Sequence, residues 1–180
     1  MKNLNWAIVI IIFSVSASGQ NTIEKAKGIS IMGGITGKGY YGELFYNQHL
    51  ATKFQIEVSS RAERAQINGY AINSYSINPA INYTIFKPAK WLHLNVKAGL
   101  SAYVNERTNS TLNDVLLVNR NTLVLDYGVF AGIETEVYMS SRFSWITNIR
   151  QNYNINSSPG NLIFYAGTGV RILFMKKKTE

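Results

Sequence analysis

Apolar and polar residues alternate along most of the chain from Gly28 onward, which is the period of a β-strand with two different faces. In the stretch from Leu123 to Val137, for example, leucine, tyrosine, valine and isoleucine alternate with glycine and acidic residues. The alternation predicts eight strands, over Gly28–Thr36, Tyr40–Asn47, Ala51–Ser59, Ser74–Ile85, Leu92–Val104, Leu123–Val137, Phe143–Arg150 and Leu162–Phe174. The fold class that these strands predict is all-β.

The links between the predicted strands alternate in length. Short links are expected at Gln48–Leu50, Lys87–Lys90 and Ser140–Ser141, and longer polar loops at Arg61–Gly69, Asn105–Asn121 and Asn152–Asn161, with a shorter one at Gly37–Gly39. Several strands reach the ~9–11 residues that a tilted strand needs to cross a bilayer. This pattern predicts an eight-stranded antiparallel up-and-down outer-membrane β-barrel, with both termini on the short-turn, periplasmic side.

The first residues have the features of an export signal. Lys2 precedes the apolar run Trp6–Phe13, and Ala17-Ser18-Gly19 supplies small residues at a cleavage site before Gln20. A transmembrane anchor is the alternative, but the run is shorter than the ~20 residues of a spanning helix. We therefore predict a signal peptide at residues 1–19 and a single β-barrel domain at residues 20–180.

A soluble ligand-binding barrel would also alternate, with its apolar face turned inward. Here the polar face is rich in glycine, serine, asparagine and charges of both signs, which suits a narrow lumen. Pro79 lies within a strand and predicts a bulge or a local break there. Aromatic residues near strand ends suit the girdles at a membrane interface, and they are Tyr40, Trp91, Tyr103, Tyr138, Phe143 and Phe174.

The polar face predicts a cluster of charges inside the barrel. Its members are Lys97, Asp126, Glu134, Glu136, Arg150 and Arg171, and the same face also carries Glu43, Lys53 and Glu57. Glu134 and Glu136 lie two residues apart, with Arg150 on the neighbouring strand. Such a pair could serve acid–base chemistry or ion conduction, but no nucleophile constellation accompanies it. A lumenal ion-pair network is the favoured interpretation.

Composition narrows the chemistry further. Only 16% of the residues are charged, against the usual ~25%. The absence of cysteine excludes disulfides, thiolate metal sites and cysteine nucleophiles. His49 and His93 lack metal-ligand spacing, and the glycine-rich stretch from Gly33 to Gly39 fits a hairpin turn better than a phosphate loop. We therefore expect no catalytic residue, no cofactor and no metal.

The formal net charge of +8 allows a nucleic-acid partner, yet the basic residues are dispersed, so no direct nucleic-acid binding is predicted. The last strand closes on an aromatic residue, as final strands of outer-membrane barrels do. Gly169, Ile172 and Phe174 are therefore predicted to be a barrel-assembly signal. The basic tail Lys176–Lys178 follows, either as a solvated segment or as a dock for an acidic periplasmic partner.

The succession of strands resembles the TraO family of conjugative-transposon proteins from Bacteroidetes. The motifs that carry the resemblance are Asn82-Tyr83-Thr84-Ile85-Phe86, Leu94–Leu100, Tyr127–Gly132 with Glu134 and Glu136, Ser141-Arg142-Phe143 and Ala166–Phe174. The resemblance implies a non-enzymatic outer-membrane component of a conjugative DNA-transfer apparatus, a type IV secretion system. It implies other conjugal transfer proteins as partners, beside outer-membrane lipid.

Two other functions remain open. The first is a stand-alone surface barrel that binds a host ligand or lipopolysaccharide through Arg61–Gly69 and Asn105–Asn121. The second is an outer-membrane lipid-modifying enzyme.

Overall fold

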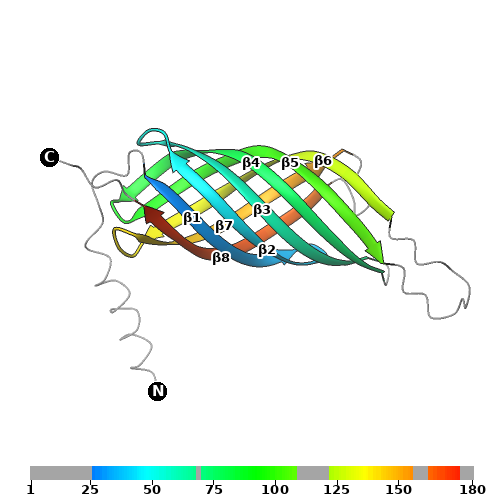
Figure 1. The fold of residues 1–180 in the computed structure, drawn as a ribbon. Helices are drawn as coiled ribbons and strands as arrows, with labels where there is room; N and C mark the ends of the chain where they lie inside the picture. Colours follow the sequence, from blue (N-terminus) through cyan, green and yellow to red (C-terminus); the bar gives the residue numbers. More distant parts are fainter. Residues whose placement is uncertain (1–25, 68–69, 109–121, 156–161, 175–180) are drawn as a thin grey trace, which may run out of the picture.

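The computed structural model describes residues 26–67, 70–108, 122–155 and 162–174, which form a closed antiparallel barrel (Figure 1). Its strands are β1 (Lys27–Thr36), β2 (Gly39–His49), β3 (Phe54–Ile67), β4 (Tyr70–Ala89), β5 (Leu92–Thr108), β6 (Thr122–Tyr138), β7 (Phe143–Asn154) and β8 (Leu162–Phe174). Each strand pairs with its neighbours in sequence, and β8 pairs with β1 to close the sheet. The predicted all-β, up-and-down topology is confirmed. In this part of the chain no helix has the length and apolar character needed to cross a membrane.

The two faces of the sheet are sorted as the alternation predicts. In β7 the side chains alternate strictly between exposed and buried along the whole strand. Large apolar side chains point outward, as at Leu125, which is 73% exposed, while charged ones such as Lys97 are fully buried in the lumen. An apolar exterior around a polar interior is the arrangement of an outer-membrane barrel and the reverse of a soluble ligand-binding barrel. The exterior therefore faces lipid.

The ends of the third strand differ from the prediction. β3 begins at Phe54, not at Ala51, and continues to Ile67, so the predicted loop Arg61–Gly69 is mostly strand. In this part of β3, polar or small side chains lie on both faces, with Arg61 and Glu63 pointing inward. Because residues 61–66 include no large apolar side chain, alternation of hydropathy could not reveal this part of the strand.

The two ends of the barrel differ. One end carries the links at residues 50–53, 90–91 and 139–142, and here Lys27 pairs with Phe174, so the described chain begins and ends at this short-turn end (Figure 1). The opposite end carries the hairpin turn between β1 and β2, where the Lys38 N–H donates to Thr36 Oγ1 at 3.1 Å. The predicted turn in the glycine-rich stretch is thus confirmed. The predicted signal peptide, the Lys176–Lys178 tail and residues 109–121 lie outside the described residues.

Pro79 does not produce a bulge. The ladder between β4 and β5 pairs Ile77 with Ala102 and Ala80 with Gly99. The register is therefore the same before and after Pro79, and only the two residues of β4 between Ile77 and Ala80 are unpaired with β5. The break in pairing at Pro79 is therefore local, as expected for a residue without an N–H. The register shifts of this ladder lie nearer the short-turn end, between Thr84 and Ala89.

Two of the predicted girdle aromatics lie inside the barrel. Tyr103 and Tyr138 are 3% and 4% exposed, because their positions fall on the inward face of β5 and β6. Tyr40, Phe143 and Phe174 point outward, as predicted. Aromatic residues thus serve two purposes in this chain, at the exterior ends of strands and as packing within the lumen.

Glycine is required at position 169 of β8 because the backbone of β1 lies too close to admit a side chain there. A Cβ at this position would collide with the Ile31 carbonyl oxygen and lie 2.7 Å from Met32 Cα. At Gly33, on the neighbouring strand, a Cβ would have only the Tyr41 carbonyl oxygen nearby, at 3.8 Å. The backbone therefore requires glycine at the first position and not at the second.

This difference predicts opposite outcomes for two matched substitutions. Gly169→Ala is expected to lower the free energy of unfolding by about 1–3 kcal/mol, because backbone atoms must move to admit the methyl group. Gly33→Ala is expected to leave the free energy of unfolding unchanged or slightly raised. Urea titration of the barrel folded in detergent micelles measures both, and equal effects would contradict the predicted packing.

The lipid-facing assignment predicts the effect of a charge on the exterior. Val129 is 48% exposed on the outward face of β6. Val129→Arg is expected to destabilise the inserted barrel by ~2–4 kcal/mol near the bilayer midplane, since the guanidinium must leave water. Val129→Leu is the control and should insert normally. Heat-modifiable gel migration after membrane fractionation is the measurement, and normal insertion of the arginine variant would overturn the assignment.

Candidate functional site: the lumenal charge network

Arg171 of β8 is the centre of an ion-pair network inside the barrel. Its side chain is fully buried, and its guanidinium lies 2.9 Å from Glu134 Oε1 through Nη2 and 2.8 Å from Glu136 Oε2 through Nη1. The Nε–H donates to Ser30 Oγ at 3.0 Å. Because the planar guanidinium carries several donors in a fixed geometry, one side chain joins β8 to β6 and β1.

Lys97 of β5 is the second cation of this network. Its Nζ lies 2.8 Å from both Glu57 Oε1 and Glu134 Oε2, and 4.9 Å from the centre of the Phe45 ring. Arg171 also approaches Glu57, at 3.6 Å between Nη2 and Oε2. Charges from β3, β5, β6 and β8 therefore meet across the lumen. We call Lys97, Arg171, Glu57, Glu134 and Glu136 the lumenal network.

The carboxylates of this network are fully engaged. Glu134 places one oxygen against Arg171 and the other against Lys97. Glu136 accepts a hydrogen bond from Ser144 Oγ at 2.6 Å on the oxygen that does not face Arg171. Both oxygens of Glu134 and of Glu136 are therefore taken up by protein groups, and neither is left over for a substrate. The geometry is that of a structural ion-pair network.

Arg150 forms a separate ion pair, which corrects the expectation that it joins Glu134 and Glu136. The ladder places Arg150 opposite Gly132, and its Nη2 lies 2.7 Å from Glu43 Oε2 of β2. Ser59 Oγ donates to the other oxygen of Glu43 at 2.5 Å. Because the barrel is narrow, a long side chain on β7 reaches β2 across the lumen more readily than it bends toward its own neighbours.

An aromatic layer adjoins this second ion pair. The Tyr165 ring lies close to two guanidiniums, with its centre 4.0 Å from Arg61 Cζ and 5.1 Å from Arg150 Cζ. Arg61 Nη2 donates to Tyr103 Oη at 3.2 Å, and Tyr165 Oη donates to Glu63 Oε2 at 2.8 Å. Cation–π contacts and hydrogen bonds therefore compensate the buried charges in a layer where few carboxylates are available.

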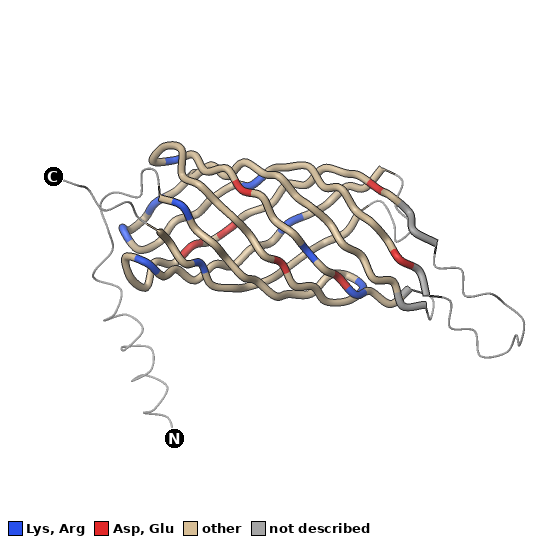
Figure 2. Tube along the Cα trace, viewed as in Figure 1, with Lys and Arg blue, Asp and Glu red and all other residues tan. Residues whose placement is uncertain are grey.

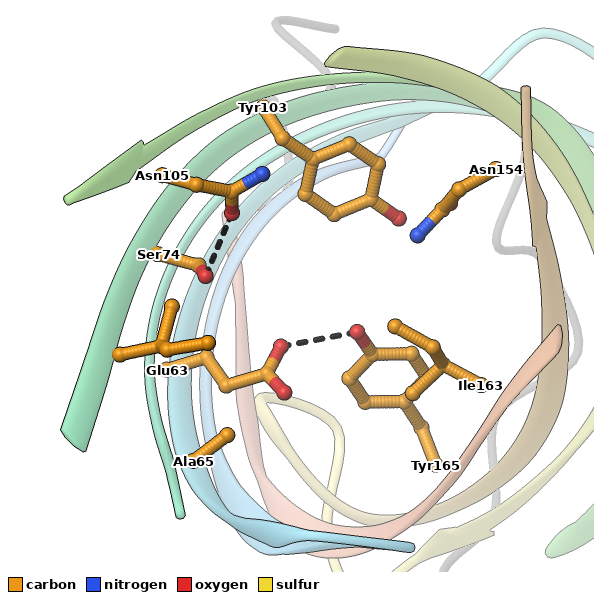
Figure 3. Close-up of a pocket in the computed structure, with 9 residues that line it drawn as sticks. Glu63, Ala65, Ser74, Tyr103, Asn105, Asn154, Ile163 and Tyr165 are labelled. Atoms are coloured by element: carbon orange, nitrogen blue, oxygen red, sulfur yellow. Dashed lines mark hydrogen bonds between the residues drawn. The ribbon is translucent and has the colours of Figure 1, made fainter. Parts of the chain in front are cut away.

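A small cavity adjoins the aromatic layer, on the side of the barrel end opposite the short turns. Figure 3 shows two hydrogen bonds in it, from Tyr165 to Glu63 and from Ser74 to Asn105. Its volume is about 10 Å³, which is room for about one water molecule. The lining residues are Glu63, Ala65, Ile72, Ser74, Tyr103, Asn105, Asn154, Ile163 and Tyr165. Around this cavity the lumen is occupied by large buried side chains, among them Arg61, Arg150 and Arg171, as expected for eight strands.

The structure brings together most of the predicted charge cluster. Lys97, Glu134, Glu136 and Arg171 meet as predicted. Asp126 is buried in the lumen but lies opposite Tyr103, at the far end of β6 from Glu134. Arg150 and Glu43 are lumenal but form their own ion pair. Lys53 does not enter the lumen and is exposed in the link between β2 and β3. The period of two gives the face of a residue, whereas its level along the barrel depends on strand tilt and register.

Arg61 and Glu63 are the lumenal residues that the sequence pattern missed. Both are buried in β3, in the stretch predicted to be a loop. The signal for them was present but weak, because Glu57, Ser59, Arg61 and Glu63 continue one face at a strict period of two.

The two histidines lie near the short-turn end of the lumen. His93 of β5 packs against the ring of Tyr138, with 4.7 Å between ring centres, and His49 is the last residue of β2. Within the described ranges, no group of three or more histidine, aspartate and glutamate side chains is arranged to hold a metal ion.

The predicted assembly signal lies in the last strand. Ile172 and Phe174 point outward, at 39% and 52% exposure, and Gly169 sits at the close contact with β1. Its role in recognition stays a prediction.

The fold can now be compared with known proteins. No protein-family model matches the chain, and no curated protein matches it. Among solved structures, the chain is similar to the N-terminal β-barrel domain of Pseudomonas aeruginosa OprF, at 16% identity and a TM-score of 0.59 over 84% of this chain and 98% of that one. It is also similar to Neisserial surface protein A, at 11% identity and a TM-score of 0.60 over 83% of this chain and 96% of that one. A major outer membrane protein from Thermus thermophilus shares 10% identity at a TM-score of 0.66, over 83% and 99% of the two chains.

These likenesses concern the fold. Together with the apolar exterior and the ion-paired lumen, they define the class: the chain has the fold of an eight-stranded outer-membrane β-barrel.

The lumenal network predicts a large cost for removing its central cation. Arg171→Leu leaves Glu134 and Glu136 buried with less positive charge, and the free energy of unfolding is expected to fall by about 3–5 kcal/mol. Arg142→Leu, at an exposed arginine outside the lumen, should change it by less than about 0.5 kcal/mol. Adding Glu134→Gln to Arg171→Leu should restore part of the loss. Urea unfolding in micelles compares the three, and an Arg171 variant as stable as the Arg142 variant would refute the network.

Proposed function

We propose that this chain is a non-enzymatic outer-membrane scaffold in a conjugative DNA-transfer apparatus of the type IV secretion class. The observation that carries the scaffold role is the filled, ion-paired lumen. A barrel whose lumen is filled by side chains has no route for DNA or protein through its centre. Its lipid-facing wall and its two ends remain available for contacts with other proteins. The assignment to conjugation rests on the resemblance of its strand motifs to the TraO family.

The proposed orientation follows from the shape of the barrel. The short-turn end, which also holds both ends of the described chain, would face the periplasm, after export directed by residues 1–19. Other conjugal transfer proteins would then meet the links at residues 50–53, 90–91 and 139–142 or the tail at Lys176–Lys178. Outer-membrane lipid surrounds the wall, and no cofactor, catalytic step or direct contact with nucleic acid is part of the proposal.

A stand-alone surface barrel is the second candidate. It is favoured by the shared fold with Neisserial surface protein A, whose name places it at a surface. In that case a host ligand or lipopolysaccharide would bind at the end opposite the short turns, through the predicted loop Asn105–Asn121, of which residues 105–108 belong to β5. The stretch Arg61–Gly69 no longer fits this role, since β3 continues to Ile67 and Arg61 lies in the lumen.

Conjugation assays separate the two candidates. Deleting the gene should abolish mating, and the wild-type gene supplied in trans should restore it. Two matched variants then test which end matters: one replaces the link at residues 50–53 with glycine and serine, and the other replaces Lys38 in the opposite turn with serine. The first variant should insert, as shown by heat-modifiable migration, yet fail to restore mating, whereas the second should restore it.

Co-purification supplies the direct measurement. Tagged protein extracted in mild detergent should carry other transfer proteins with it, and the variant at residues 50–53 should lose them. A barrel recovered alone from a strain whose mating does not depend on it would disprove the scaffold role and favour the surface barrel.

A further inference from the structure

Charge is distributed radially in this barrel. Among the described residues, six acidic side chains are buried in the lumen with four basic ones: Glu43, Glu57, Glu63, Asp126, Glu134 and Glu136 with Arg61, Lys97, Arg150 and Arg171. Glu106, which is half-buried near the end of β5 opposite the short turns, is the one described carboxylate outside this group. Among the described residues, six of the seven acidic side chains therefore lie inside the barrel, and the exposed side chains of this part of the chain carry a net positive charge.

The exposed basic residues gather at one end. Five of them belong to the short-turn end, and we call them the basic rim: Lys27, Lys53, Lys87, Lys90 and Arg142. In Figure 2, blue positions gather around the end where the described chain starts and finishes. None of the ion pairs between described residues includes any of the five. Their charges are therefore exposed to solvent, and none has a carboxylate of the described chain as its ion-pair partner.

The basic rim runs around the whole circumference. Lys27 begins β1, Lys53 lies between β2 and β3, Lys87 and Lys90 lie at the hairpin of β4 and β5, and Arg142 lies between β6 and β7. Every hairpin of this end therefore contributes at least one positive charge.

Aromatic side chains accompany the rim on the outer wall. Phe54 and Tyr83 pack edge to face, with 5.0 Å between ring centres, and Phe143 and Phe174 are about half exposed at the same end. Trp91 follows Lys90 directly, and Trp145 lies one outward position beyond Phe143. Aromatic rings with adjacent lysines and arginines are typical of the level where lipid head groups begin.

We propose that the basic rim binds the phosphate head groups of anionic phospholipids in the leaflet on the short-turn side. The complete ring favours a leaflet over an acidic protein, because lipid surrounds every strand, whereas a docked protein covers one sector. Each lysine or arginine at this level attracts an anionic head group electrostatically. The opposite end lacks such a ring in the described chain: its exposed Lys38 and Arg64 are accompanied by Glu106. This inference does not depend on a role in conjugation.

The tryptophans of the rim make the proposal measurable. With Trp6→Phe present in every sample, Trp91 and Trp145 are the remaining tryptophans of the chain. The protein is folded into vesicles of phosphatidylcholine and phosphatidylglycerol in which one lipid at a time is brominated near the head group. Quenching of tryptophan fluorescence then gives the relative binding of the two lipids at the rim. We expect a preference for phosphatidylglycerol of about fivefold at low salt.

Two variants of matched chemistry locate the effect. A rim variant with Lys53→Gln, Lys87→Gln, Lys90→Gln and Arg142→Gln should reduce the preference to about one, as expected when the phosphate contacts are removed. A control variant with Lys38→Gln and Arg64→Gln removes charge from the opposite end and should keep the preference. In the wild-type barrel, about 0.5 M salt should also remove most of it, because exposed charges are screened.

Each possible result decides the question. A wild-type ratio near one at low salt overturns the proposal. The proposal is also overturned if the rim variant keeps the preference for phosphatidylglycerol, or if the control variant loses as much of that preference as the rim variant does. An acidic protein would then be the candidate partner of the basic rim. If the rim variant does not fold, the salt titration of the wild-type barrel remains, and a preference that is insensitive to salt counts against phosphate binding.

Discussion

Everything else in this barrel depends on the need to compensate charge in a lumen that side chains fill. A carboxylate or a guanidinium without a partner at such a site would cost several kcal/mol. Each carboxylate must therefore meet a cation or a hydrogen-bond donor, and each guanidinium a carboxylate or a hydrogen-bond acceptor. Arg171 and Lys97 meet this demand by contacting carboxylates from several strands at once. The same contacts fix the register of the strands, since a shift of one residue would turn every charge toward lipid.

The exterior must be apolar where it contacts lipid. Its outward positions are apolar over the part of each strand that meets lipid, and the few exposed charges lie toward the ends. The formal charge of +8 is therefore not a uniform property of the molecule. Carboxylates outnumber basic groups in the described lumen, and basic groups outnumber carboxylates on the surface, so a partner at the surface meets a more basic protein than the net charge indicates.

The sequence was sufficient for the number of strands, their order, the facing of each side and four members of the lumenal network. A period of two determines these features directly, because adjacent side chains in a strand lie on opposite faces. The partners of Arg150 and the position of Asp126 could not be predicted, because they depend on strand tilt and on side chains that cross the lumen. The extent of β3 was missed since Arg61, Ala62, Glu63 and Arg64 show no contrast between the faces. Tyr103 and Tyr138 were misplaced because aromatic residues suit both a lipid interface and a packed lumen.

The location of Arg171 has a consequence for the order of assembly. It lies in β8, the last strand of the chain, while the carboxylates that it neutralises lie in β3 and β6. A sheet that has not yet added β8 therefore holds Glu136 without its ion-pair partner, while Glu57 and Glu134 keep only Lys97. Closure of the barrel by β8 is therefore also the step that places a cation beside Glu136.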